Sequence, residues 1–328
     1  MTGTSHTKII LPHALSIECC GVRIDQPVLS VNCQGRIFQF VLDDELRKHT
    51  SFHAGLSVNL SIKRQEWLRY PVSRRFCALF ESPLNACYQD IEGLTERYSI
   101  IFTHQAELIK RGQPFKELMF GTNWVNVVTD EDTARARIQH PEKTRLVSFI
   151  GSLEHEKVGA YQLRREVAEY CMKNATDTVD CFGRGIRPVD DKREALAPYR
   201  FSIAMENAAS DYYFSEKLVD CLLMDVVPIY YGCPGIGDLF DQRGILQFQS
   251  LTELRSILET LSLGQYQAML PFARQNKERV IKNNWHSHLG IFTRIAEELP
   301  RDLYGAAEAS GSTSLASSVL RKIWKRFW

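Results

Sequence analysis

The chain has 328 residues, of which 44% are hydrophobic and 24% are charged. This composition is typical of a soluble globular protein and excludes a disordered polymer, a collagen-like repeat and a polytopic membrane protein. Lys and Arg (40) almost balance Asp and Glu (39), so the net charge is +1 and nothing in the overall composition indicates nucleic-acid binding. The length predicts about two domains.

We expect no export signal or membrane span at the N-terminus, because the apolar run 9–11 is interrupted by Pro12 and His13. The nine cysteines contain no CxxC pair, and several lie inside apolar runs, where Cys usually acts as a small buried hydrophobe. The sequence therefore predicts reduced structural thiols in a cytosolic setting.

Strands and helices alternate along most of the chain. Strands are predicted at 28–31, 37–42, 75–80, 99–103, 146–150, 178–182, 199–205 and 226–231. Helices are predicted to start near 43 and to span 106–111, 161–172 and 216–224, and a polar linker is predicted at 130–144. This alternation predicts parallel sheets covered on both faces, which bind ligands beyond the carboxyl ends of their strands.

The C-terminal tail differs in composition from the rest. Residues 305–318 form a linker of small residues, and apolar residues then recur at helical spacing through 315–328, including Trp324 and Trp328. Four cations lie between them, which is typical of a helix that rests on an anionic membrane. The alternative is a helix docked on the protein's own core, and we favour the membrane.

Several familiar motifs are absent from the sequence: a complete dinucleotide fingerprint, a P-loop lysine motif, HExxH and GxSxG. His286 and His288 could chelate a metal, although two histidines alone rarely do. The acidic run 130–132 follows an apolar segment as a metal-binding DxD motif can. We favour a helix N-terminus, where carboxylates in the first turn are stabilised.

The segment 199–235 is the richest in candidate binding residues. A strand delivers Glu206 and Asn207 to its carboxyl edge. Ser215 stands where a helix N-cap belongs, which puts Glu216 and Lys217 in the first turn. Free backbone N–H groups and a lysine suit a phosphate, and a carboxylate can accept hydrogen bonds from sugar hydroxyls. A capped helix with a surface ion pair is the alternative.

This segment resembles the donor-binding motif of glycosyltransferase family ten, the α-1,3/α-1,4-fucosyltransferases, of bacterial type. The matching motifs are Phe80-Glu81-Ser82-Pro83, Ser148-Phe149-Ile150-Gly151-Ser152, Val179-Asp180-Cys181-Phe182-Gly183-Arg184-Gly185, Met205-Glu206-Asn207, Tyr213-Phe214-Ser215-Glu216-Lys217 and Val227-Pro228-Ile229-Tyr230-Tyr231-Gly232-Cys233-Pro234. They cover about residues 75–250 in the family's order. The sequence departs from the family at Met205, where Phe is more usual, and in the tyrosine loop before Tyr213.

The resemblance implies an α/β fold of the GT-B type, in which two Rossmann-like domains face each other across a cleft. Residues 1–143 would form the acceptor side, 144–304 the donor side, and 305–328 the linker and amphipathic helix. The implied reaction moves L-fucose with inversion from GDP-β-L-fucose to an oligosaccharide hydroxyl, with an α-1,3 linkage expected to N-acetylglucosamine or glucose in lipopolysaccharide or a similar surface glycan. The alternatives are another nucleotide sugar, or a non-catalytic, membrane-associated module that binds sugar nucleotides.

The resemblance also implies roles for individual residues. Glu81 would be the general base, and a raised pKa would suit it to that role. The implied donor-binding residues are Arg164, Asn207, Tyr213, Ser215, Glu216 and Lys217, with Glu206, Gly183, Arg184 and Tyr230 as further candidates for the donor pocket. Because two cations would hold the diphosphate, no metal or other cofactor is expected.

The expected partners are GDP-fucose, a glycan or glycolipid acceptor and, through residues 315–328, an anionic membrane surface; no nucleic acid is expected. These expectations place the protein in the cytoplasm, peripherally on the inner face of the cytoplasmic membrane.

Overall fold

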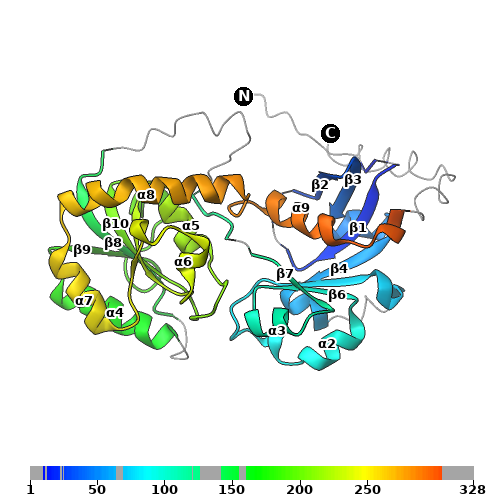
Figure 1. Ribbon diagram of the computed structural model, residues 1–328, viewed down its shortest axis with the longest axis horizontal. Helices are drawn as coiled ribbons and strands as arrows, with labels where there is room; N and C mark the ends of the chain where they lie inside the picture. The colour runs from blue at the N-terminus through cyan, green and yellow to red at the C-terminus, as the bar shows by residue number, and fades with distance from the viewer. Residues whose placement is uncertain are drawn as a thin grey trace.

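The computed structural model describes residues 10–11, 13–22, 24, 26–63, 69–119, 121–125, 142–154 and 160–304. The acidic run 130–132 and the tail 305–328 lie outside these residues, and so do the predictions made for them. Figure 1 shows two α/β domains side by side, with the first drawn in blue and cyan and the second in green and yellow.

The first domain is built on a largely parallel sheet. Its described strands are β1 (Leu15–Cys20), β2 (Val28–Cys33), β3 (Arg36–Val41), β4 (Ala54–Val58), β5 (Arg75–Leu79), β6 (Ile100–Thr103) and β7 (Phe115–Glu117), in the order β2-β3-β1-β4-β5-β6-β7. Of their pairings only β2–β3 is antiparallel. Its helices are α1 (Asp44–Lys48), α2 (Ile91–Arg97) and α3 (Ala106–Lys110).

The second domain is built on a fully parallel sheet. Its described strands are β8 (Arg145–Ile150), β9 (Val179–Phe182), β10 (Tyr199–Met205), β11 (Val227–Tyr231) and β12 (Leu246–Gln247), in the order β12-β11-β10-β8-β9. The helices that follow them are α4 (Ala160–Asn174), α5 (Glu216–Leu223), α6 (Ile236–Leu239), α7 (Leu251–Thr260), α8 (Leu263–Lys282) and α9 (His288–Glu298). The strands predicted from apolar runs in both domains are confirmed.

Each sheet has a point at which the strand order reverses. In the second sheet, β8 pairs with β9 on one side and with β10 on the other. In the first sheet, β1 pairs with β3 and with β4 in the same way. Loops leave such neighbouring strands in opposite directions, which opens a crevice beyond their carboxyl ends. The fold therefore provides one site for a ligand in each domain.

Helix α9 packs on the first sheet, although it follows α8 of the second domain along the chain (Figure 1). Phe292 is fully buried and its ring centroid lies 4.7 Å from that of Phe40 in β3. Burying such a side chain is worth about 1.5–3 kcal/mol, which fastens the helix to the first domain. The sequence predicts that residues 144–304 all belong to the second domain, and for α9 this prediction is wrong. The sequence gives no sign of this change of domain, because only residues 283–287 separate α8 from α9.

In the described part of the chain, two segments between the domains, one after β7 and one before α9, are hydrogen-bonded to each other. The backbone N–H groups of Gly121 and Thr122 both donate to the carbonyl of Trp285, at 2.8 and 2.9 Å. The Asn123 amide donates to the carbonyl of His286 at 2.9 Å. These bonds join the segment after β7 to the segment before α9.

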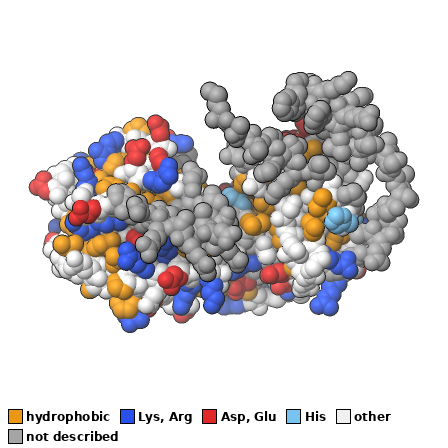
Figure 2. All heavy atoms as spheres, turned by 90° about the horizontal axis from the view of Figure 1, so that it is seen from above, with side chains coloured by type: hydrophobic (Ala, Val, Ile, Leu, Met, Phe, Trp, Pro, Cys, Tyr) orange, Lys and Arg blue, Asp and Glu red, His pale blue; other side chains and the backbone are white. Residues whose placement is uncertain are grey.

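The surface and the cysteines fit the expectations from composition. Figure 2 shows cationic and anionic side chains interspersed over the described part of the face that it presents. All nine cysteines are unpaired, and all except the half-buried Cys181 are buried. Among the described residues, no helix combines the length and the apolar character needed to cross a bilayer.

Candidate active site

A cavity of about 650 Å³ lies at the carboxyl ends of β8 and β10, at the crevice that the strand order creates. This volume is in the usual range for small-molecule sites. The predicted residues that line it are Arg164, Gly183, Arg184, Asn207, Glu216 and Lys217. The structure thus brings together residues from α4, the loop after β9, the loop after β10 and the first turn of α5.

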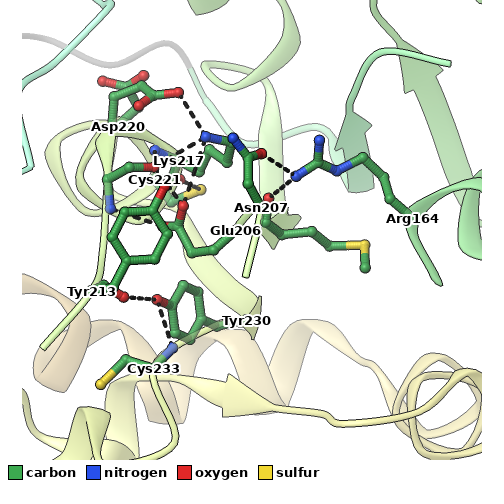
Figure 3. Close-up of polar contacts among 12 residues, drawn as sticks. Arg164, Glu206, Asn207, Tyr213, Lys217, Asp220, Cys221, Tyr230 and Cys233 are labelled. Carbon is green, nitrogen blue, oxygen red and sulfur yellow. Dashed lines mark hydrogen bonds and ion pairs between the residues drawn. The ribbon is translucent and has the colours of Figure 1, made fainter. Parts of the chain in front are cut away.

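Arg164 is the most deeply held cation of this cavity. Its Nη2 donates to the carbonyl of Met205 at 2.7 Å and to Oδ1 of Asn207 at 2.8 Å (Figure 3). The guanidinium also lies 4.9 Å from the centre of the Tyr161 ring. Arg164 is only 5% exposed, yet it lines the cavity. Its hydrogen bonds to Met205 and Asn207 therefore hold its charge in a fixed position at the cavity wall. Such preorganised cations suit a phosphate.

Ser215 is the N-cap of α5, as the sequence predicts, and its hydroxyl accepts a hydrogen bond from the N–H of Lys217. A second anchor was not foreseen: the fully buried Glu206 accepts bonds from the Ser215 N–H at 2.8 Å and from its hydroxyl at 2.6 Å. Glu206 and Ser215 do not line the cavity. They hold the N-terminus of α5 against the end of β10.

Lys217 stands between two carboxylates. Its Nζ lies 3.1 Å from Glu216 and 3.7 Å from Glu206 (Figure 3). Burial acts to lower the pKa of Lys217, but these two carboxylates outweigh it and the pKa is raised. Burial acts to raise the pKa of Glu216, but Lys217 and Lys192 outweigh it and the pKa of this carboxyl is lowered. Lys217 is therefore a cation and Glu216 an anion at neutral pH.

The turn after β9 is shaped by a close approach of two glycines. Gly183 has a φ of +120°, and a Cβ on it would lie 1.8 Å from the carbonyl oxygen of Gly151. Only glycine fits such a position. Both residues line the cavity, so this contact sets part of its wall.

The other predicted donor residues lie outside this lining. Tyr230 is fully buried; its hydroxyl accepts from the Cys233 N–H at 3.2 Å and lies 3.3 Å from the carbonyl of Tyr213, to which it donates (Figure 3). Tyr213 is 5% exposed, and its ring packs against His104 of the first domain with centroids 4.8 Å apart. Because no loop conformation can be read from sequence, this contact between domains was not foreseen.

Three of the other cavity residues, which the sequence did not predict, are Tyr161, Trp124 and Lys192. Tyr161 precedes Arg164 by one helical turn, and that spacing was the available signal. Trp124 is 63% exposed and lies beside Lys192, whose Nζ is 5.5 Å from the centre of the indole. The buried Asp220 holds both, since it accepts from Lys192 Nζ at 2.6 Å and from the Trp124 N–H at 2.9 Å. The sequence carries no local signal for this contact, because the partners come from three separate segments.

Glu81 follows β5 in the first domain, where its exposed side chain lines a second cavity of about 920 Å³. This cavity lies at the carboxyl ends of β1 and β4, the reversal point of the first sheet. The surrounding protein reduces solvation and raises the pKa of Glu81, while Lys217 of the second domain acts to lower it. Glu81 is thus within electrostatic reach of the donor-side cation, and its raised pKa suits proton abstraction.

The described residues hold no group of three or more His, Cys, Asp and Glu side chains that could bind a metal ion. His286 and His288 are half-buried to buried at the start of α9, and burial lowers the pKa of both imidazoles.

The fold has solved counterparts among glycosyltransferases and sugar-phosphate synthases. A crystal structure of an α1,3-fucosyltransferase with GDP aligns with a TM-score of 0.50 and 16% identity over 82% of this chain and 83% of that one. Sucrose-phosphate synthase from Thermosynechococcus elongatus aligns with a TM-score of 0.52 and 11% identity over 89% and 99% of the two chains. The fold is therefore of the GT-B class, as predicted.

Residues 140–290 match the family model described as glycosyltransferase family 10 (fucosyltransferase), C-terminal part. This match confirms, for that part of the chain, the resemblance to glycosyltransferase family 10 seen in the sequence.

Curated relatives match shorter segments. GDP-fucose protein O-fucosyltransferase 3 of Bos taurus is 41% identical over 81 residues, which are 23% of this chain and 17% of that protein. Alpha-(1,3)-fucosyltransferase B of Drosophila melanogaster is 51% identical over 43 residues, which are 13% of this chain and 10% of that protein. The chain thus covers less than a fifth of the length of either relative.

Proposed function

We propose that this protein transfers L-fucose from GDP-β-L-fucose to a hydroxyl of an oligosaccharide, with inversion at the anomeric carbon and an α-1,3 linkage. The observation that carries the proposal is the pair of cations, Arg164 and Lys217, in one cavity of a family 10 fucosyltransferase domain. Lys217 lies in the first turn of α5, where backbone N–H groups favour phosphate, and Arg164 lines the same cavity from α4.

In the proposed reaction the acceptor oxygen bonds to the anomeric carbon and its proton passes to the Glu81 carboxylate. The bond from that carbon to the β-phosphate oxygen breaks, and its electron pair leaves with GDP. Arg164 and Lys217 oppose the growing charge on the phosphate, and each such donor is worth about 3–4 kcal/mol in the transition state. Glu216 accepts a hydrogen bond from a ribose or fucose hydroxyl. Because these two cations neutralise the leaving group, we propose that no metal is required.

The test is GDP release from GDP-fucose in EDTA, with and without acceptors that contain N-acetylglucosamine or glucose. Release that depends on an acceptor and survives EDTA supports the proposal. GDP-mannose and UDP-sugars serve as matched donors, and a preference for one of them would contradict the choice of donor. Tight GDP binding without any turnover would support a non-catalytic binding module instead.

A second candidate acceptor is a protein hydroxyl. It is favoured by the relatives of Bos taurus and Mus musculus, which are named GDP-fucose protein O-fucosyltransferase 3. Folded domains with exposed Ser or Thr, followed by mass spectrometry for an added deoxyhexose, distinguish this acceptor from an oligosaccharide.

The proposed location is the inner face of the cytoplasmic membrane, with the tail 315–328 on anionic lipid. Deletion of residues 311–328 should abolish sedimentation with anionic vesicles and leave activity on a soluble acceptor intact. Unfolding of the truncated chain would show that the tail belongs to the core.

A further inference from the structure

His104 is a buried residue at the boundary between the two domains. It directly follows β6, is 1% exposed, and packs its ring against Tyr213 of the loop that precedes α5, with centroids 4.8 Å apart. The Tyr88 ring meets it edge-on from the first domain, at 6.1 Å. Its position therefore joins the loop next to the donor cavity to the core of the first domain.

The polar contacts of His104 decide which of its nitrogens carries the proton. Nε2 lies 2.8 Å from the carbonyl oxygen of Glu81 and 3.2 Å from the hydroxyl of Tyr88. A carbonyl can only accept, so Nε2 bears the proton and donates it to Glu81. The Tyr88 hydroxyl is itself a donor to the carbonyl of Leu79 at 2.9 Å. Burial lowers the pKa of His104 to about 4, so the ring is neutral at neutral pH.

The other backbone polar group of Glu81 is held as well. Asn59 Oδ1 accepts from the N–H of Phe80 at 2.7 Å and from the N–H of Glu81 at 3.2 Å. Asn59 after β4 and His104 after β6 therefore hydrogen-bond to the N–H and to the carbonyl of Glu81, respectively. The Glu81 side chain is exposed, so these bonds fix the main-chain position from which its carboxylate extends.

We propose that His104 is a positioning residue. Its Nε2–H fixes the backbone of Glu81, and its ring contact with Tyr213 links the position of Glu81 to the donor side. This inference rests on the proposed function, in which Glu81 takes the acceptor proton. His104 touches neither the donor cavity nor the proposed reacting atoms.

Two substitutions separate the two contacts of His104. Phe in H104F keeps a ring against Tyr213 but removes the donor to Glu81, and we expect kcat to fall about a hundredfold with little change in the KM for GDP-fucose. Gln in H104Q keeps an N–H donor but removes the ring, and we expect most of kcat to return while the KM for GDP-fucose rises. An equal loss in both variants, or no loss in either, overturns the proposal.

A third comparison tests that the effect runs through Glu81. In the E81Q background, H104F should cause no further loss, because positioning a group that cannot act as a base has no value. A merely structural role would reduce the activity again. If H104F does not fold, as measured by urea unfolding, N59G takes its place. This variant removes the hydrogen bonds that Asn59 accepts from the N–H groups of Phe80 and Glu81, and its φ of +51° is one that glycine tolerates. The same non-additivity with E81Q is expected.

A measurement without turnover separates this inference from the proposed function. Binding of GDP should slow hydrogen exchange in the segment 80–88 of the wild type, and H104Q should remove that slowing. If the wild type transfers no fucose, the proposed function fails. The exchange result alone then shows whether His104 couples GDP binding to the segment 80–88. Equal slowing in wild type and H104Q contradicts the coupling.

Discussion

Arg164 donates to Oδ1 of Asn207 at 2.8 Å and thereby ties the middle of α4 to the end of β10. A second bond from the same nitrogen, to the carbonyl of Met205, fixes the direction of the guanidinium. The position of the Arg164 charge at the donor cavity is therefore fixed before any ligand binds. A charge that is fixed in advance can lower the activation barrier of a reaction and does not only aid substrate binding.

Replacing Arg164 by Ala should lower fucosyl transfer about a hundredfold or more, because a preorganised cation facing the leaving diphosphate is lost. Steady-state kinetics with GDP-fucose measures the loss. The matched control is Lys173→Ala, an exposed cation on the same helix whose nearest carboxylate oxygen is 3.9 Å away. Similar activity in both variants would remove Arg164 from the mechanism.

Replacing Glu81 by Gln should reduce transfer to a small residual rate and leave GDP affinity unchanged, since the amide cannot take a proton. The reaction needs the carboxylate form, so activity should fall as the pH drops through the pKa of Glu81, which lies above its ordinary 4.5. A pH profile of kcat/KM and GDP titration calorimetry check both points. Glu107→Gln, a highly exposed carboxylate of the same domain, is the control. Full transfer by the Glu81 variant would eliminate it as the base.

Replacing Gly183 by Ala should weaken GDP binding strongly, because the new Cβ would collide with the Gly151 carbonyl and displace the cavity wall. The matched control is Gly35→Ala, at a φ of +77° with no atom within 4 Å of the added Cβ. Both variants carry backbone strain, but only the first carries the clash. Unaltered GDP affinity in Gly183→Ala, measured by calorimetry, would contradict the role of this close approach.

Replacing Phe292 by Ala should reduce the free energy of unfolding by about 3–5 kcal/mol, since a fully buried ring is lost from the contact between α9 and the first sheet. Urea denaturation followed by circular dichroism measures the change. Leu289→Ala on the same helix, where the side chain is 51% exposed, should be nearly neutral. A small effect of Phe292→Ala would mean that α9 is only loosely attached.

Much of the fold and part of the site were readable from the sequence. Apolar runs and helix caps act over a few residues, so the strand at Tyr199–Met205 and the cap at Ser215 were predicted correctly. The strands β1 and β4 were not predicted, because a buried Glu18 and the Gly-Leu-Ser run of β4 blur the apolar pattern.

The sequence by itself determined the alternation of strands and helices, the parallel sheets and the motifs that resemble glycosyltransferase family 10, because these depend on local patterns. Only the tertiary structure decided that α9 returns to the first domain, that Asp220 holds Lys192 and Trp124, and that His104 joins Glu81 to Tyr213. These contacts join segments far apart in the chain, and their stability comes from burial and hydrogen bonds that exist only once both domains are packed.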